Sequence, residues 1–209
     1  MFIKLLNFKI LNFNLITTIL LIQAVLGQTF AQGTLEIINI PNGSFEGIPK
    51  GASCPKEWVA CGYNSTPDIL PGPWGVTNIP SDGYSYLGLT AREDKTFEAI
   101  STKLLKPLRK NQCYNFKVDL CRSSAYAGFN GAGTMRIWGA KSSCERLQLL
   151  AVSPVISNYD WKTFSFSFFA KDNYDYIIIE CYYKMPSLFH YRANILIDAF
   201  FYFESCDRA

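Results

Sequence analysis

The chain has 209 residues, of which 49% are hydrophobic and 15% are aromatic. It carries 20 Lys and Arg against 17 Asp and Glu, which gives a formal net charge of +3. This near balance argues against nucleic-acid binding, because phosphate recognition needs a clustered basic surface. The apolar content is sufficient for a sizeable core and excludes wholesale disorder, and the length favours a single domain.

Residues 1–31 have the organisation of a secretory signal peptide. Lysines near the start precede a mostly apolar stretch over 15–26, and small residues at Thr29 and Ala31 fit a cleavage site. The alternative is an uncleaved membrane anchor, but polar residues interrupt the stretch, and a span needs about 20 apolar residues. We predict cleavage after Ala31 and a mature domain over 32–209 without a transmembrane segment. The mature chain is then secreted or held in the cell envelope.

Seven cysteines agree with export, because disulfides persist in oxidising compartments. No CxxC pair occurs and His190 is the single histidine, so zinc binding has little support. An odd number leaves at least one thiol free or paired between molecules. We predict that Cys181, inside an apolar run, is free and that Cys54 and Cys61 staple a small loop.

The spacing of the other cysteines restricts their pairing. Cys113 and Cys121 flank one strand-like run and would lie roughly 26 Å apart when it is extended, so they cannot bond to each other. If this run and the next one, 133–140, form a hairpin, then Cys113 comes opposite Cys144. We therefore predict a Cys113–Cys144 disulfide.

Short runs rich in aromatic and β-branched residues dominate the chain, with no convincing helical pattern between them. They predict strands at 35–40, 83–89, 98–104, 113–121, 134–139, 161–169, 176–184 and 194–203. The intervening segment 47–82, rich in Gly, Pro and Cys, is expected to be a loop. Such a series predicts an all-β fold, an antiparallel sandwich or barrel.

The order of several motifs resembles carbohydrate-binding-module-like domains with the galactose-binding jelly-roll fold. The matching elements are Asn42-Gly43-Ser44-Phe45-Glu46-Gly47, Leu104 to Pro107, Tyr114 to Leu120, Trp161 with Phe164, and Asn194-Ile195-Leu196-Ile197-Asp198. The resemblance covers about 35–206 and implies an antiparallel β-sandwich of jelly-roll type.

A narrower resemblance points to exported bacterial domains that often precede a cell-wall-binding or secretion-sorting domain. It rests on Cys54-Pro55, Trp58 and Thr66-Pro67-Asp68, followed by Ser85-Tyr86-Leu87-Gly88-Leu89.

Catalysis has little support in the sequence. A hydrolase triad needs a base oriented by a third group, and His190 is the only histidine. No GxSxG, HExxH, P-loop or GxGxxG spacing is present. Paired carboxylates could make a glycosidase, but nothing in the sequence brings two together. We expect a protein that is not an enzyme.

The resemblance implies a structural calcium site shared by Glu46 and Asp198. First and last strands commonly neighbour each other in a sandwich, and two close buried carboxylates would need a cation or a proton. The alternative is that Glu46 caps a turn and that Asp198 accepts hydrogen bonds from backbone amides.

Side-chain alternation predicts one polar and aromatic sheet face. In 134–138, Met135 and Ile137 are expected to face the core, which puts Arg136 and Trp138 on the opposite side. The run 176–184 alternates in the same way, with its even positions outward.

Sugar rings have apolar faces rimmed by hydroxyl groups, and they suit an aromatic platform beside charged hydrogen-bonding groups. If the strands over 134–138 and 176–184 adjoin, the predicted ligand-binding residues are Arg136, Trp138, Glu180 and Tyr182, with Lys117 and Asp119 expected from a neighbouring strand. The alternative is that the aromatic rings only cover this face.

Four aromatic residues in and beside the predicted loop could form a second site at one end of the sandwich. They are Trp58, Trp74, Tyr84 and Tyr86, and the favoured interpretation is that the loop tryptophans plug one end of the core instead.

The sequence thus predicts a secreted, non-catalytic module that recognises a glycan or another cell-surface polymer. The alternative is a structural or adhesive envelope protein that uses the sandwich for protein contacts, and a hydrolase is a third hypothesis.

Overall fold

A computed structural model describes residues 35–183 and 191–206. The predicted signal peptide, its cleavage site at Ala31 and His190 lie outside the described residues. The described strands form two sheets. One contains β1 (Ile37–Asn39), β3 (Asp68–Leu70), β4 (Tyr86–Ala91), β6 (Cys113–Cys121), β7 (Gly131–Ala132), β10 (Lys162–Phe169), β12 (Ala193–Asp198) and β13 (Tyr202–Ser205). The other contains β2 (Val59–Cys61), β5 (Ala99–Leu108), β8 (Thr134–Ala140), β9 (Gln148–Val152) and β11 (Tyr174–Tyr182).

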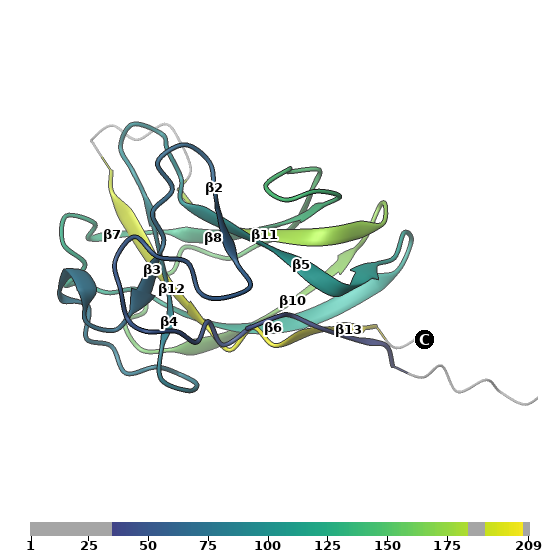
Figure 1. Ribbon diagram of the computed structural model, residues 1–209, viewed down its shortest axis with the longest axis horizontal. Coiled ribbons are helices and arrows are strands. Elements are labelled where there is room, and N and C mark those ends of the chain that lie inside the picture. Colours follow the sequence, from purple (N-terminus) through teal and green to yellow (C-terminus); the bar gives the residue numbers. More distant parts are fainter. Residues whose placement is uncertain (1–34, 184–190, 207–209) are drawn as a thin grey trace, which may run out of the picture. The chain divides into compact units, whose positions relative to one another are not determined.

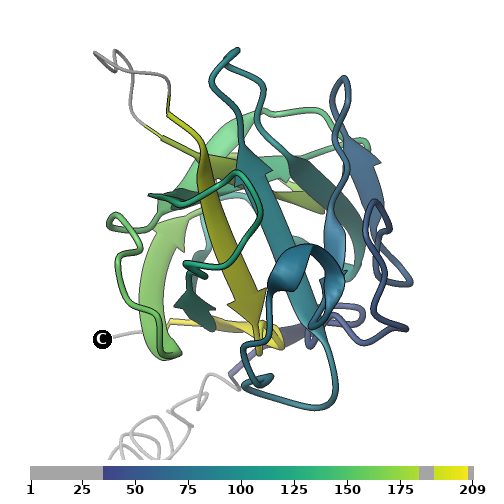
Figure 2. The same ribbon diagram turned by 90° about the vertical axis from the view of Figure 1, so that its left-hand side faces the viewer.

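The two sheets lie face to face, with β5, β8 and β11 in one layer and β6, β10 and β13 in the other (Figure 1). Figure 2 shows the same two layers from one end. The strand pairs are antiparallel apart from a short parallel contact between β7 and β12. The predicted all-β sandwich is therefore confirmed. No helix among the described residues is long and apolar enough to cross a membrane.

Alternation along the strands fills the space between the sheets. The even positions of β6 are buried in the core, as are Met135 and Ile137 of β8 and the odd positions 177, 179 and 181 of β11. Aromatic rings from β6, β10 and β13 stack and cross in this core, with Phe116 in contact with Phe166 and Phe203. The predicted inward and outward sides of these strands are confirmed.

Strand β6 is paired along both edges. β10 runs along one edge, and β12 and β13 follow each other along the other. Asp198 at the end of β12 lies opposite Asp119, whereas Phe203 in β13 lies opposite Phe116. The predicted single strand over 194–203 is therefore wrong, because residues 199–201 leave the ladder.

The break at 199–201 is held by the segment that follows β1. Ala199 has a φ of 53°, and the backbone N–H of Phe200 donates to the carbonyl of Gly43 at 2.8 Å. A Cβ at Gly43 would collide with the Phe200 carbonyl oxygen, so only glycine allows this approach. Phe200 is consequently buried in the core, while Phe201 faces outward.

The predicted loop over 47–82 is only partly irregular. It contributes β2, β3 and a 3-10 turn, η1 (Pro73–Gly75). β2 pairs with β5 in one sheet, and β3 pairs with β4 in the other. Strands of three residues carry too little alternation to be recognised from sequence, which is why both were missed.

The disulfides differ from the predicted pairs. Cys61 bonds to Cys144, and Cys113 bonds to Cys206. The Cys113–Cys144 prediction failed because β6 and β8 belong to different sheets and do not form a hairpin. The Cys54–Cys61 prediction is also wrong.

Three thiols are free among the described residues, at Cys54, Cys121 and Cys181. The predictions that Cys181 is free and that Cys113 does not bond to Cys121 are therefore confirmed.

Removal of the Cys113–Cys206 disulfide by the double substitution Cys113→Ser, Cys206→Ser should lower the free energy of unfolding by about 2–5 kcal/mol. The bond closes a loop with a sequence separation of 93, and long loops lose the most chain entropy on cross-linking. Urea unfolding followed by fluorescence measures the loss. Peptide mapping of the wild type under non-reducing conditions should find Cys113 joined to Cys206, and a different partner would contradict the assignment.

Candidate functional site

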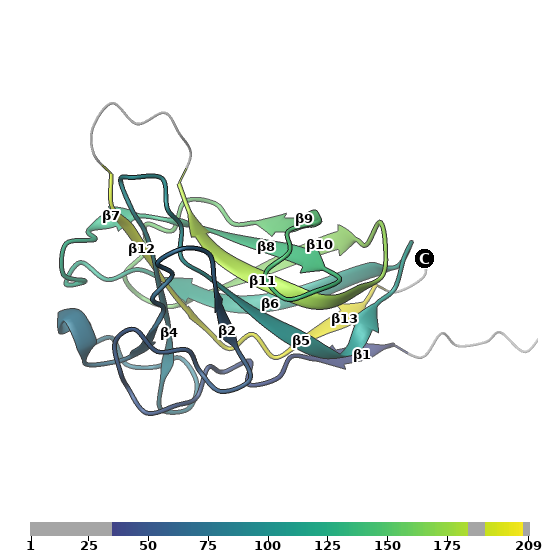
Figure 3. The ribbon, with the colours of Figure 1, turned by 45° about the horizontal axis from the view of Figure 1, so that its top comes forward.

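The predicted ligand-binding residues lie on the outer face of the five-stranded sheet, where β2, β5, β11, β8 and β9 follow one another (Figure 3). β8 and β11 are direct neighbours in this sheet, with Arg136 opposite Glu180 and Trp138 opposite Ile178. Because the inward positions are filled by the core, the alternate side chains of both strands project to this one face. The structure therefore brings Arg136, Trp138, Glu180 and Tyr182 together.

Glu180 lies at the centre of the cluster that it forms with Arg136, Trp138 and Tyr182. Its carboxylate is almost fully buried and forms a salt bridge with Arg136, whose Nε also donates to Oε2 at 2.8 Å. The indole N–H of Trp138 donates to the same oxygen at 3.3 Å. Arg146 from the loop after β8 reaches the other oxygen, Oε1, at 3.1 Å. The buried charge is thus compensated by two guanidinium groups, as burial of a carboxylate requires.

Arg136 also contacts the aromatic rings of the cluster. Its guanidinium carbon lies 3.6 Å from the ring centre of Tyr182 and 5.3 Å from that of Trp138. Phe97 packs edge-on against Tyr182, with 5.1 Å between ring centres. These cation–π and ring contacts fix the orientation of the side chains before any ligand arrives.

Part of the same face is covered. Ile178 points outward from β11 but is fully buried, because it packs with Cys61, Ala99 and Ala140 beneath the Cys61–Cys144 disulfide. Trp138 packs against the edge of this covered part and remains half-buried. The open part of the face is consequently the area around Arg136, Trp138 and Tyr182.

Two expected contributors are absent from this face. Lys117 and Asp119 lie on β6 in the opposite sheet, so the expectation that they come from a neighbouring strand is wrong. Sequence reasoning also missed Phe97 and Arg146. Neither residue lies within one of the thirteen strands of the described residues, so no alternation could have assigned either to this face.

The aromatic residues proposed as a loop-end site divide into two pairs. Trp58 and Tyr86 are buried, and the Tyr86 hydroxyl donates to the Asn78 carbonyl at 2.9 Å. Trp58 therefore plugs the core, as the favoured interpretation expected of the loop tryptophans. Trp74 is instead exposed, so the favoured interpretation is wrong for this residue, and Tyr84 is exposed as well.

Glu46 and Asp198, the predicted calcium ligands, hold the same loop, 81–85, through backbone amides. The N–H groups of Ser81 and Asp82 donate to Asp198 Oδ2 at 2.9 and 3.0 Å. The N–H of Tyr84 donates to Glu46 Oε1 at 3.0 Å. This geometry is the one expected from the alternative to a calcium site, in which both carboxylates accept hydrogen bonds from backbone amides.

Asp198 is a carboxylate in an unfavourable environment for its charge. Burial raises its pKa to about 7, although the amide hydrogen bonds act in the opposite direction, and the nearby Asp82 carboxylate raises it further. Within 35–183 and 191–206, no group of three or more His, Cys, Asp and Glu side chains is arranged to hold a metal. The acidic side chains described here would therefore need backbone carbonyls or water to complete a calcium site.

The free thiols are poorly placed for bonds between molecules. Cys121 and Cys181 are buried, and burial raises the pKa of the half-buried Cys54 to about 11, with a further contribution from Glu98. Because the thiolate is the reactive form, Cys54 is a weak nucleophile at neutral pH.

No protein-family profile matches the sequence, and no curated protein matches it. Solved structures do share its fold. An arabinose-bound GH51 α-L-arabinofuranosidase aligns with a TM-score of 0.53 and 11% identity over 83% of this chain, but over only 27% of its own length. The K2 cleaved adhesin domain of Lys-gingipain from Porphyromonas gingivalis aligns with a TM-score of 0.50 and 10% identity, over 82% of this chain and 99% of the domain.

Carbohydrate-binding modules are also among the matched structures. The CBM22-1 xylan-binding domain of Paenibacillus barcinonensis Xyn10C aligns with a TM-score of 0.49 and 14% identity, over 80% of this chain and 94% of the domain. At these identities the comparisons establish the fold alone. At that level, the antiparallel β-sandwich that the resemblance implied is the fold of this chain.

The substitution Glu180→Gln should lower the free energy of unfolding by about 3 kcal/mol, because it leaves two partly buried guanidinium groups without their counter-charge. The matched control is Arg146→Ala, which removes the more exposed partner and should cost about 1 kcal/mol or less. Urea unfolding of the three proteins measures both effects. A Glu180→Gln protein as stable as the wild type would show that the cluster is not held by this charge.

Proposed function

We propose that this protein is a secreted, non-catalytic module that binds a glycan or another cell-surface polymer on the open part of the five-stranded sheet. The observation that carries the proposal is the convergence of Arg136, Trp138 and Tyr182 around the buried Glu180. The two disulfides are compatible with an oxidising compartment, which supports export.

The chemistry of the cluster suits a sugar ring. Trp138 is half-buried, with the Arg136 guanidinium over its ring, and both Arg136 and Arg146 keep N–H donors beyond those that pair with Glu180. An apolar surface edged by fixed hydrogen-bond donors matches the C–H face and hydroxyl rim of a sugar. Because Glu180 already holds the guanidinium groups in place, little side-chain entropy is lost when a ligand binds.

The second candidate is a structural or adhesive envelope protein. The exposed rings of Trp74 and Tyr84 favour it, because large aromatic side chains on a surface suit protein contacts. The adhesin domain of Lys-gingipain has the same fold. In this case the sheet face would be scaffold and the loops would make the contacts.

A glycan array distinguishes the two candidates. The wild type should bind at least one oligosaccharide or polysaccharide, and Trp138→Ala should weaken that binding about tenfold, since loss of an aromatic platform costs on the order of 1 kcal/mol or more. Trp74→Ala is the matched control and should bind like the wild type. Absence of binding to every glycan by a folded protein would remove this function and favour the adhesive one.

We further propose that calcium binds at Glu46 and Asp198. Support comes from the resemblance and from the charge environment, because two neighbouring carboxylates, Asp82 and Asp198, favour a proton or a cation. When bound, calcium would supply the positive charge that the buried Asp198 lacks and would tie the end of β12 to loop 81–85.

Thermal unfolding against pH, in EDTA and in calcium, tests this site. In EDTA the free energy of unfolding should fall as pH rises from about 4 to about 7, because Asp198 binds a proton more tightly in the folded chain than in the unfolded one. Asp198→Asn should lessen this fall. Calcium favours the ionised carboxylate, so at pH 7 it should raise the Tm of the wild type by about 2–4 °C or more. Identical Tm values in EDTA and calcium would show that Glu46 and Asp198 do not bind calcium and only accept hydrogen bonds from the loop backbone.

A further inference from the structure

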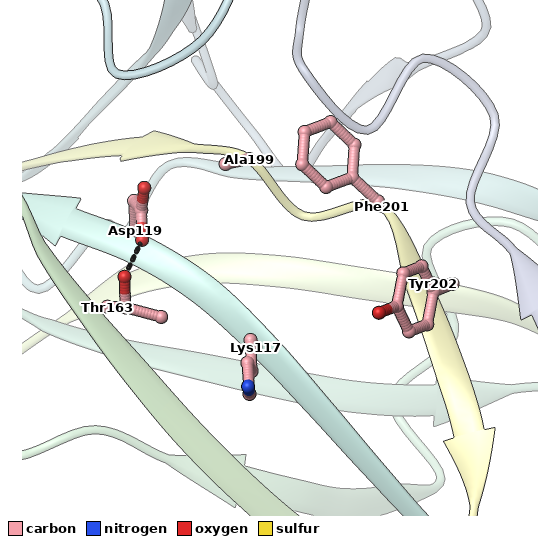
Figure 4. A pocket seen from close by; sticks show the side chains of 6 residues that line it. All are labelled: Lys117, Asp119, Thr163, Ala199, Phe201 and Tyr202. Carbon is pink, nitrogen blue, oxygen red and sulfur yellow. Dashed lines mark hydrogen bonds between the residues drawn. The ribbon is translucent and has the colours of Figure 1, made fainter.

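The outer face of the opposite sheet contains a hollow that the sequence did not predict. It arises where residues 199–201 leave the ladder, because β6 then lacks a partner strand between Asp119 and Phe116 on that edge. The hollow has a volume of about 230 Å³. Figure 4 shows Lys117 and Asp119 of β6 on one side of it and the rings of Phe201 and Tyr202 on the other.

A second hollow of about 250 Å³ adjoins the first along the same strands. Lys117 and Tyr202 line both, so the two form one groove over β6, β10 and β13. The groove extends along β6 from Asp119 to Asn115, which corresponds to roughly 13 Å in an extended strand. It is therefore long enough for an extended ligand.

Some of the polar groups that line the groove are hydrogen-bonded within the protein, and others are free. Thr163 donates to Asp119, and Ser167 donates to Asn115, each at 2.6 Å. In the described part of the chain, by contrast, the Lys117 ammonium and the hydroxyls of Ser165 and Tyr202 make no hydrogen bond to protein. These free groups are available to a ligand.

The charges and the rings of the groove select the class of ligand. Lys117 is its one basic residue, and Asp119 and Glu204 are acidic, so a polyanion is not favoured. Phe201 and Tyr202 are 44% and 42% exposed, which leaves ring surface open beside the free hydroxyls. An apolar wall next to hydroxyl, amide and ammonium groups suits a neutral, hydroxyl-rich chain.

We propose that this groove, here called the β6–β13 groove, is a second glycan-binding site that takes a segment of a neutral polysaccharide. The groove is lined by residues that do not belong to the first site, and it lies on the opposite face of the sandwich. A module with two such faces can bind two polymer segments at once, which raises its avidity for a polymer above its affinity for a short oligosaccharide.

Affinity electrophoresis in gels that contain soluble xylan, β-glucan or galactomannan tests the groove, with polygalacturonate as the anionic comparison. The Trp138→Ala protein, which lacks the platform of the first site, should still be retarded by at least one neutral polymer. Adding Tyr202→Ala to it should weaken this retention about five- to tenfold, as loss of a stacked ring predicts. Adding Phe169→Ala instead should have no effect, because this exposed ring on β10 lies outside the groove.

The outcomes separate the two sites, with thermal unfolding used to confirm that each variant is folded. Retention that is abolished by Trp138→Ala alone, or that is indifferent to Tyr202→Ala, would overturn the second site and leave the first. Retention lost with Tyr202→Ala but kept with Trp138→Ala would support the groove and overturn the first site. Stronger retention by polygalacturonate than by any neutral polymer would overturn the proposed ligand class.

Discussion

The burial of the inner faces of two sheets against each other is the constraint on which the rest of the structure depends. Side chains along a strand alternate, so filling the core with the even positions of β6 and the odd positions of β11 leaves the other half of each strand facing outward. Both proposed ligand sites are built mainly on outward strand positions, to which the loop after β8 adds Arg146 and the break at 199–201 adds Phe201. Their backbone positions are set by the core, which is why a ligand would meet a rigid surface and not a mobile loop.

The two outer faces are organised by different means. On the five-stranded sheet, a buried carboxylate, Glu180, gathers Arg136, Arg146 and Trp138, and the resulting network fixes their orientation. On the other sheet, an interruption of strand pairing at 199–201 leaves a groove beside β6. The first proposed site is thus organised by charge compensation, and the second by the lack of a partner strand along one edge of β6.

The connections around the sheets are held by covalent and carboxylate contacts. Cys61–Cys144 ties β2 to the loop after β8 and covers part of the five-stranded sheet, and Cys113–Cys206 ties the start of β6 to the end of β13. Asp198 and Glu46 hold loop 81–85 from two sides. Of these contacts, the Cys61–Cys144 disulfide limits how much of the five-stranded sheet stays open.

Local sequence pattern was enough to predict the all-β class, the bounds of β6, and the outward orientation of Arg136, Trp138, Glu180 and Tyr182, because alternation with a period of two is a property of consecutive residues. That these four side chains meet depends on the pairing of β8 with β11. The pairing of strands was not predictable in this way. The Cys113–Cys206 bond, the location of Lys117 and Asp119 on the opposite sheet, the arrival of Arg146 at Glu180 and the groove beside Tyr202 all depend on which distant strands become neighbours. Only the tertiary structure decides that, since the free energy of burying two faces together is shared among residues far apart in the chain.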